Sequence, residues 1–346
     1  MVLIKLYSKL LTSLFRSNDV IETLYLDISG SCNLSCRMCS LKTWYKNRGQ
    51  MSMDTVSRLA KLFESGSVNR VSLQCNCEPL LNNNITDIVR FIKQKNKNIY
   101  IFFVTNGTLL NPQVIASLLK SGINDIAISL DGATKETYEK VRLGADFDLV
   151  ISNIKELVRQ RALEPNELKQ IGLITVGTKE NIYELQDILA IGKQLGVNYL
   201  IVPGLEPYTE EMANMVLYGR KISPQYRELF VKLIQKGRGY GINVVLPFLK
   251  ANRFRHCLVG KCLMSCSIDW NGDLHPCSSL SYERDYYYLG KKTSRPRVTF
   301  GNINKQDIYD IWDSKEFKQF RHNVLIGRLQ PYCRNCLTKD WVISPF

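Results

Sequence analysis

The feature that most limits how this chain can fold is a regular alternation of short apolar runs with helix-like segments between residues 22 and 205. The apolar runs are rich in β-branched and aromatic residues and are bounded by Gly, Asn or Asp, as buried strands are. Six such runs occur, at 23–29, 70–75, 99–105, 125–130, 171–176 and 199–203. Helical periodicity follows at 53–65, 84–94, 112–119, 146–158 and 181–195. Because parallel strands need helical crossovers, this alternation predicts a parallel sheet.

Right-handed crossovers would curl such a sheet. We therefore expect an α/β fold with a partial (βα)6, TIM-like barrel over residues 21–240, and an ordinary doubly wound sheet is the alternative. One more helix is expected at 224–236 and one more strand at 242–247. From about 250 to 346 the chain is turn-rich and carries cysteines, which predicts a small α+β domain. With little visible core, that domain would need a bound metal for stability.

The first twenty residues predict an amphipathic helix, with Lys5, Lys9 and Arg16 on one face and leucines on another. This helix either packs on the rest of the protein or makes a peripheral contact with an anionic membrane surface. No run of 18 uncharged apolar residues occurs, so the sequence predicts no membrane-spanning helix.

Eleven cysteines against three histidines are the unusual part of the composition. A loop-rich disulfide scaffold would be much shorter than 346 residues, and no secretory signal is evident. We therefore expect the thiols to serve mainly as metal ligands in a reducing cytoplasm.

Three of these cysteines lie in one loop directly after the first expected strand: Cys32, Cys36 and Cys39 in SGSCNLSCRMCS. Thiolates favour iron–sulfur clusters or zinc. A structural zinc site needs four ligands, whereas three leave one coordination position open for a reactant. The carboxyl end of a strand is also where α/β barrels build their active sites. The loop therefore predicts a reactive metal centre.

The C-x3-C-x2-C spacing in this position resembles the signature of the radical S-adenosylmethionine (SAM) superfamily. The resemblance implies that these three cysteines hold a four-iron four-sulfur (4Fe–4S) cluster and that SAM binds the fourth iron. It implies that an electron from the cluster cleaves SAM to a 5′-deoxyadenosyl radical, which abstracts hydrogen from a substrate. A flavodoxin- or ferredoxin-type protein would deliver that electron.

Further matches follow in the order of the family, over about residues 22–205. Cys77-Glu78-Pro79 resembles the Gly-Gly-Glu-Pro loop that receives the SAM ammonium group, with Cys75 and Cys77 where glycines are common. Because glycine permits close backbone approach, either the SAM contact is remodelled here or the two cysteines are packing residues. The ends of the third and fourth strands resemble positions that line the SAM site. The implied cofactor-binding residues are Glu78, Pro79, Thr105, Asn106, Ser129 and Asp131.

A second set of cysteines accompanies Gly-x4-Cys at 272–277, Gly-Asn at 301–302 and Cys-x2-Cys at 333–336. This order resembles the SPASM extension of radical SAM enzymes, or its shortened twitch form, which carry auxiliary iron–sulfur clusters. Because no cysteine follows Cys336, the resemblance implies one auxiliary 4Fe–4S cluster. Its implied ligands are Cys277, Cys333, Cys336 and one of Cys262, Cys257 and Cys266, of which we favour Cys262 and then Cys257. Zinc bound by the same thiolates is the alternative.

Four thiols remain after the two sets are subtracted, 11 − 3 − 4. Some radical SAM epimerases return a hydrogen atom to a substrate radical from a cysteine thiol, which makes Cys266, Cys75 and Cys77 candidate catalytic donors. The alternative is that they are small buried hydrophobic residues.

The formal net charge of +14 attracts acidic partners. Two clusters with their thiolates would lower it to about +11. The basic residues are scattered and no RNA-binding signature accompanies them, so we do not expect a nucleic acid partner.

The expected function is a radical SAM enzyme of the oxidoreductase or epimerase type that modifies a peptide or protein. A small-molecule dehydrogenase or epimerase, acting on an aminosugar or nucleoside, is the alternative. A non-catalytic metal-stapled or RNA-binding protein is the alternative of another class.

Overall fold

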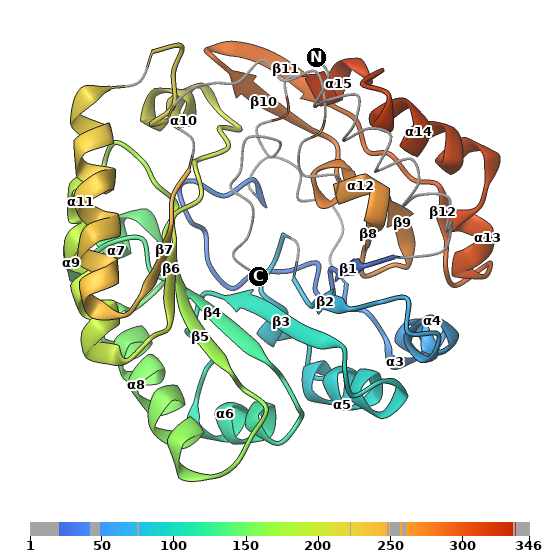
Figure 1. The fold of residues 1–346 in the computed structure, drawn as a ribbon, viewed down its shortest axis with the longest axis horizontal. Coiled ribbons are helices and arrows are strands. Elements are labelled where there is room, and N and C mark those ends of the chain that lie inside the picture. The colour runs from blue at the N-terminus through green and yellow to red at the C-terminus, as the bar shows by residue number, and fades with distance from the viewer. Residues whose placement is uncertain are drawn as a thin grey trace.

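The computed structural model describes residues 21–41, 49–74, 76–221, 223–247, 249, 257, 261–334 and 336. Its main feature is one ten-stranded sheet with the strand order β12-β9-β8-β1-β2-β3-β4-β5-β6-β7. The sheet curves, and most of the helices lie on its outer face (Figure 1).

Seven strands of this sheet, from β1 to β7, run parallel to their neighbours. Their bounds are β1 (Thr23–Leu26), β2 (Arg70–Ser72), β3 (Tyr100–Thr105), β4 (Asp125–Ser129), β5 (Gln170–Ile174), β6 (Tyr199–Ile201) and β7 (Asn243–Val245). Every residue of β4 is buried, as expected for a parallel strand covered on both faces. The strand positions agree with those expected from the sequence. The prediction of a partial TIM-like barrel is confirmed.

The crossovers are helical, and several helices begin at a residue whose side chain caps the first turn. These capping residues are Ser52, Asn111, Thr134, Asp146 and Thr209. The helices are α3 (Met53–Ser57), α4 (Ala60–Glu64), α5 (Ile85–Lys95), α6 (Pro112–Leu119), α7 (Lys135–Val141), α8 (Phe147–Leu163), α9 (Leu185–Leu195), α10 (Glu210–Met215) and α11 (Pro224–Tyr240), with the 3₁₀ turns η1 (Pro79–Leu81) and η2 (Ile182–Glu184).

The helix expected at 53–65 is divided, because α3 ends at Ser57 and α4 begins at Ala60. The sequence analysis did not predict α7 or α10. They have only seven and six residues, which is too few to establish a helical period.

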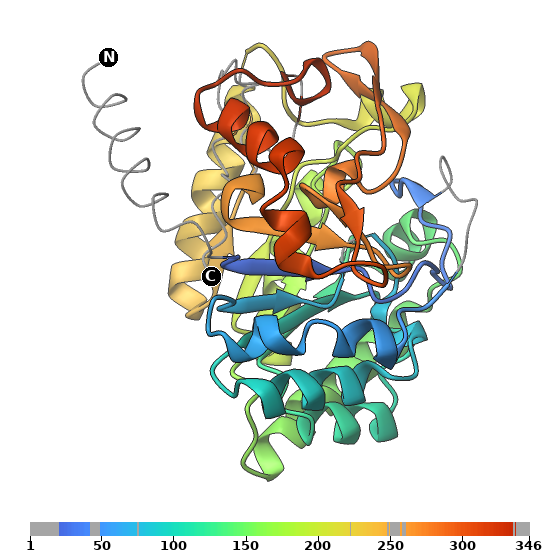
Figure 2. The same cartoon turned by 90° about the vertical axis from the view of Figure 1, so that its right-hand side faces the viewer.

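The C-terminal region is joined to the barrel through β8 (Ser265–Ile268), which pairs in parallel with β1. Strand β9 (Asp273–His275) pairs antiparallel with β8, and β12 (Gly301–Asn302) pairs with β9. A separate antiparallel hairpin consists of β10 (Arg284–Tyr288) and β11 (Lys291–Arg295). The remaining elements are α12 (Lys261–Met264), η3 (Ser278–Leu280), α13 (Ile308–Trp312), α14 (Lys315–Leu325) and α15 (Pro331–Arg334). Figure 2 shows these orange and red elements beside the blue first strand.

Aromatic side chains give the C-terminal region a larger core than the sequence analysis expected. The rings of Phe300 and Phe317 stack with centroids 4.3 Å apart, and Trp312 meets Phe317 edge-on at 5.1 Å. Arg321 covers the Trp312 ring at 4.0 Å. The expectation of little core was wrong because these residues lie on short helices and loops, which show no long hydrophobic period.

The expected N-terminal helix at 1–20 lies outside the described residues. Among the helices that are described, none combines the length and the apolar character that crossing a bilayer requires.

Candidate functional site

The loop after β1 carries Cys32, Cys36 and Cys39 and is tied to the end of α7. Two backbone hydrogen bonds join them, from Ser35 N to the Leu143 carbonyl at 3.0 Å and from Arg37 N to the Val141 carbonyl at 2.9 Å. A small apolar cluster lies at this loop, and its buried members are Leu34, Cys36, Met38, Val141, Leu205, Met212 and Met215. The positions of the three thiols therefore follow from contacts with α7 and α10 as well as from the loop itself.

Each of the three thiols accepts a hydrogen bond. Cys32 Sγ accepts from Leu34 N at 3.4 Å and from Asn106 Nδ2 at 3.9 Å. Cys36 Sγ lies 4.0 Å from Arg142 Nη1, and Cys39 Sγ accepts from Leu41 N at 3.5 Å. Donors to sulfur favour the thiolate form, which is the form that binds metal.

Burial raises the pKa of Cys32 and raises that of Cys36 to about 11, although the Arg142 guanidinium opposes the effect at Cys36. Metal ligation reverses this, because a coordinating thiol is deprotonated. In the part of the chain that is described, no three His, Cys, Asp or Glu side chains converge as ligands of one metal ion would. Cysteine thiolates are the usual protein ligands of iron–sulfur clusters, so the donor set of this loop fits such a cluster.

Glu78 lies in the loop after β2 and is almost completely buried. Its carboxylate accepts hydrogen bonds from Thr105 Oγ1 at 2.7 Å, Asn106 N at 2.8 Å and Leu80 N at 3.1 Å. Burial raises the pKa of this carboxyl group, while the donors from Asn106 and Thr105 oppose the rise. The structure thus brings together Glu78, Thr105 and Asn106 beside Cys32, with Pro79 next to Glu78 in the loop. Glu78 already has three protein donors, so contact with a SAM ammonium group would use its remaining lone-pair capacity.

Asp131 and Ser129 lie at the end of β4, at the same edge of the sheet, and both are buried. The Asp131 carboxylate pairs with Arg142 Nε and accepts a hydrogen bond from Val176 N at 2.6 Å. Both of its oxygens are therefore engaged by the protein. Its expected role in binding SAM stays a prediction, and what the structure shows for Asp131 is that it holds Arg142 near Cys36.

A second group of thiols gathers in the C-terminal region, with Cys277 after β9 and Cys333 on α15. Burial raises the pKa of Cys277 to about 12, and the neighbouring thiols of Cys336 and Cys257 raise it further. The pKa of Cys333 is also raised by burial and by Cys277, Cys336 and Cys257. Cys336 N donates to the Cys333 carbonyl at 3.3 Å, which folds the Cys-x2-Cys segment into a turn. The structure therefore brings Cys257, Cys277, Cys333 and Cys336 together, whereas the side chain of Cys262 lies outside the described residues.

Two family models match the chain, the radical SAM superfamily over residues 26–192 and the SPASM iron–sulfur cluster-binding domain over residues 257–337. The chain is a radical SAM enzyme with a SPASM domain. Its cofactors are 4Fe–4S clusters and SAM. The sequence analysis identified this family correctly from the cysteine spacings.

Among curated proteins, a Pyrococcus furiosus protein named tungsten-containing aldehyde ferredoxin oxidoreductase cofactor-modifying protein is 28% identical over 321 residues, which are 92% of this chain and 87% of that one. Among solved structures, Streptococcus suis SuiB bound to S-adenosylmethionine aligns with a TM-score of 0.64 at 17% identity, over 89% of this chain and 70% of SuiB. BtrN, solved in complex with AdoMet and 2-DOIA, aligns with a TM-score of 0.51 at 16% identity, over 92% of this chain and 93% of BtrN. These likenesses to solved structures concern the fold.

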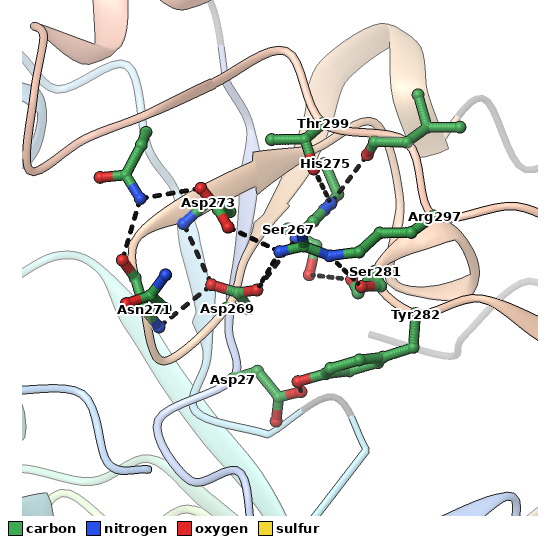
Figure 3. A network of polar contacts seen from close by, with 12 residues as sticks. Asp27, Ser267, Asp269, Asn271, Asp273, His275, Ser281, Tyr282, Arg297 and Thr299 are labelled. Atoms are coloured by element: carbon green, nitrogen blue, oxygen red, sulfur yellow. Dashed lines mark hydrogen bonds and ion pairs between the residues drawn. The ribbon is translucent and has the colours of Figure 1, made fainter. Parts of the chain in front are cut away.

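A polar network holds the radical SAM enzyme's β8–β9 hairpin, which leads to Cys277 (Figure 3). Arg297 Nη2 lies 2.9 Å from Asp269 Oδ2 and 2.6 Å from Asp273 Oδ2. The buried His275 ring lies 3.3 Å from Asp269 Oδ2 and 2.7 Å from the Val298 carbonyl. Because these side chains tie the hairpin to the segment before β12, the position of Cys277 does not depend on its own loop alone.

Asp27 connects this region to the end of the barrel that carries the three-cysteine loop. It follows β1 directly and is buried. Its carboxylate accepts from Asn76 N at 3.3 Å, from Asn76 Nδ2 at 3.2 Å and from Tyr282 Oη at 3.3 Å. Figure 3 shows Tyr282 pointing at Asp27 from the C-terminal region. The base of the cysteine loop, the loop after β2 and the SPASM domain thus meet at one carboxylate.

The three candidate hydrogen donors differ in position. Cys266 is fully buried in the main hydrophobic core on β8, where it is the register partner of Leu24. Burial raises its pKa to about 12. This apolar position disfavours Cys266 as a hydrogen donor to a substrate. Cys77 is buried in the loop next to Glu78, and Cys75 lies outside the described residues.

The sequence analysis missed Arg142 and Asp27. Asp27 could have been found, because a carboxylate that ends an apolar strand stands where α/β proteins build sites. Arg142 carried no local signal, since it is an ordinary basic residue at the end of a short helix. Only the packing of α7 against the cysteine loop gives it a place in the site.

Proposed function

We propose that this radical SAM enzyme abstracts a hydrogen atom from an unactivated C–H bond of a peptide or protein substrate. The observation that carries the proposal is the set of three thiols after β1, each with a hydrogen-bond donor. Three protein ligands would leave the fourth iron of a cluster open for SAM. When bound, the cluster and SAM supply a carbon radical by one-electron reduction. A flavodoxin- or ferredoxin-type donor in a reducing cytoplasm suits this chemistry.

The residues around the thiols have two tasks in this proposal. Arg142 and Asn106 lower the cost of holding thiolates in a buried site, because they place a positive charge and an amide donor beside sulfur. Glu78 joins the loop after β2 to the end of β3 through Thr105. Burial at this edge of the sheet keeps water away from a reactive centre.

A direct test measures 5′-deoxyadenosine by mass spectrometry after anaerobic reconstitution with iron and sulfide, dithionite reduction and addition of SAM. We expect product from the wild-type protein and none from Cys36→Ala. Cys266→Ala is the matched control, because that thiol lies in the hydrophobic core. Intact clusters without any 5′-deoxyadenosine would refute the proposal and favour a non-catalytic protein.

We further propose Cys257 as the fourth ligand of the auxiliary cluster, with Cys277, Cys333 and Cys336. Its support is the mutual electrostatic influence of these four thiols. Cys257→Ser should lose about half of the iron that wild type binds, whereas Cys262→Ser should keep all of it. The reverse result would assign the fourth position to Cys262.

A second candidate substrate is a small molecule, and in particular an enzyme cofactor. It is favoured by the Pyrococcus furiosus relative, whose name describes a cofactor-modifying protein. The peptide proposal draws instead on SuiB, which has also been solved bound to its precursor peptide SuiA. An extract of cells grown in deuterated medium, separated into peptide and small-molecule fractions, distinguishes the two. The fraction that transfers deuterium into 5′-deoxyadenosine contains the substrate, and transfer from the small-molecule fraction alone would overturn the peptide proposal.

For the reaction outcome, we propose epimerisation or oxidation and take Cys77 as the described candidate for a hydrogen donor. A reaction run in deuterated water would place solvent deuterium in the product of an epimerase. Cys77→Ala should abolish that incorporation while 5′-deoxyadenosine still forms. Incorporation at the wild-type rate would exclude Cys77 as the donor.

A further inference from the structure

The β10–β11 hairpin carries two buried arginines directly opposite each other. Arg284 and Arg295 are register partners and are only 5% and 1% exposed. Like charges that face each other across two strands repel, and a buried charge without a counter-charge is costly. The fold therefore has to supply negative charge at this place.

Glu206, which follows β6, supplies part of it. Its Oε1 lies 2.7 Å from Arg295 Nη1, and Tyr208 Oη donates to its Oε2 at 2.6 Å. The charges of Arg295 and Arg284 both lower the pKa of this buried carboxyl group. The Glu206 carboxylate balances only one of the two guanidinium charges, so one positive charge remains.

The two arginines differ in how their N–H groups are used. Arg284 Nη1 donates to Ser40 Oγ at 3.2 Å, and its Nη2 donates to the Ser278 carbonyl at 3.2 Å. All three nitrogens of Arg295 are buried, and none forms a hydrogen bond within the described structure, because the Glu206 contact is close but poorly aligned. The Arg295 guanidinium instead stacks on the Tyr286 ring at 4.2 Å. A guanidinium has five N–H donors, so the single Glu206 contact cannot satisfy all of them.

The thiols of the SPASM domain lie within the electrostatic range of this guanidinium. Helix α15, which carries Cys333, contacts strand β11, which ends at Arg295. The positive charge of Arg295 acts on Cys277 and Cys333 and lowers the pKa of each, although burial raises both. Thiolates and cluster sulfur can accept hydrogen bonds from N–H groups that Glu206 leaves unused.

We propose that Arg295 tunes the auxiliary 4Fe–4S cluster: its buried guanidinium supplies positive charge and N–H donors to the sulfur atoms and raises the reduction potential of the cluster. The inference rests on the ligand set proposed above. Hydrogen bonds to sulfur and net charge are two of the terms that set the potential of an iron–sulfur cluster. Reduction adds one electron, supplied from outside, and breaks no bond. A buried positive charge stabilises that added electron, and Glu206 counteracts it.

The experiment is a redox titration of the full-length, reconstituted protein followed by electron paramagnetic resonance. Alanines at Cys32, Cys36 and Cys39 remove the other cluster, so the signal belongs to the auxiliary cluster alone. In this background we compare Arg295→Met, Glu206→Gln and Lys292→Met. Lys292 is the matched control, because it lies on the same strand but its side chain is 61% exposed.

Arg295→Met should lower the ratio of reduced to oxidised cluster at a fixed potential by roughly tenfold, the order expected when one buried unit charge is removed near a redox centre. Glu206→Gln should raise that ratio. Lys292→Met should change this ratio less than either variant, since solvent screens an exposed charge.

An unchanged potential in Arg295→Met, with iron content retained, would overturn the inference. If that variant does not fold, Glu206→Gln decides, and an unchanged potential there would overturn the inference as well. Iron content far below four atoms in the background protein would instead refute the proposed ligand set.

Discussion

Replacing Arg142 by methionine is the sharpest test of what stabilises the surroundings of the three-cysteine loop. Arg142 is buried between the Asp131 carboxylate and the Cys36 thiol, and Asp131 itself is 0% exposed. Methionine fills much of the same space but removes the charge and all five donors. The variant therefore leaves a fully buried carboxylate without its cation.

In this variant the Asp131 side chain either stays charged or binds a proton. The free-energy cost of each state sets the expected loss of stability. Keeping the carboxylate charged and unpaired costs about 3–5 kcal/mol of folding free energy. Protonating it at pH 7.5 costs about 5 kcal/mol, at about 1.4 kcal/mol for each pH unit above an ordinary aspartate pKa of about 3.9. The two states cost similar amounts, so we expect Arg142→Met to lose about 3–5 kcal/mol at pH 7.5.

The pH dependence has a definite sign. Burial already raises the pKa of Asp131, and Arg142 opposes the rise. Without Arg142 that pKa rises further, so the folded variant binds more protons than the unfolded chain at pH values above about 4. Its stability must then fall as pH rises, until the pH passes the folded-state pKa. The deficit of the variant against wild type should be about 1–2 kcal/mol smaller at pH 6 than at pH 8.

The assay is urea unfolding of the reconstituted protein, followed by circular dichroism at both pH values. Asp131→Asn combined with Arg142→Met is the matched control, because it removes the carboxylate that Arg142 neutralises. The double variant should recover much of the lost stability and lose the pH dependence. The reasoning would be refuted if Arg142→Met lost less than about 1 kcal/mol of unfolding free energy and kept the wild-type pH profile, because a buried unpaired carboxylate should destabilise the fold by more than that.

Three further predictions concern single positions. Gly172→Ala places a Cβ 2.0 Å from the Tyr199 ring, so it should destabilise the fold by about 1–3 kcal/mol, measured as a lower urea midpoint. Burial raises the pKa of Asp125 to about 6, so its contribution to stability is present at low pH and lost as pH rises through that value. Wild type should lose about 1 kcal/mol relative to Asp125→Asn between pH 5 and pH 7, and parallel profiles would contradict this. Asn106→Ala removes a donor to Cys32 and should slow 5′-deoxyadenosine formation roughly tenfold without changing the iron content, as a mass-spectrometric time course would show.

Local patterns predicted the elements of the barrel because each is encoded within a few residues. The run Tyr100–Thr105 is β-branched and aromatic, and Pro112–Leu119 begins after a capping asparagine, so both were found with their bounds nearly correct. The short helices α7 and α10 were missed, since one or two turns contain too few apolar positions to define a period. The cysteine spacings identified the family for the same reason that the apolar runs identified the strands: the residues of each motif are close in sequence.

Contacts between segments that are far apart in the sequence could not be predicted from local patterns. The sequence analysis favoured Cys262 over Cys257 as the fourth auxiliary ligand, whereas the fold brings Cys257 near Cys277 and Cys333. Arg295 and Glu206 are almost ninety positions apart in the sequence, yet they form one buried ion pair.

The sequence by itself determined the parallel barrel, the three-thiol loop and the family of the enzyme, because hydrophobic period and ligand spacing are local properties. The tertiary structure decided which charges are buried together: Arg142 with Asp131 beside Cys36, and Arg295 with Glu206 beside the SPASM thiols. The physical reason is that a charge becomes consequential only when burial lowers the dielectric around it, and burial depends on how β1, β8 and the β10–β11 hairpin assemble.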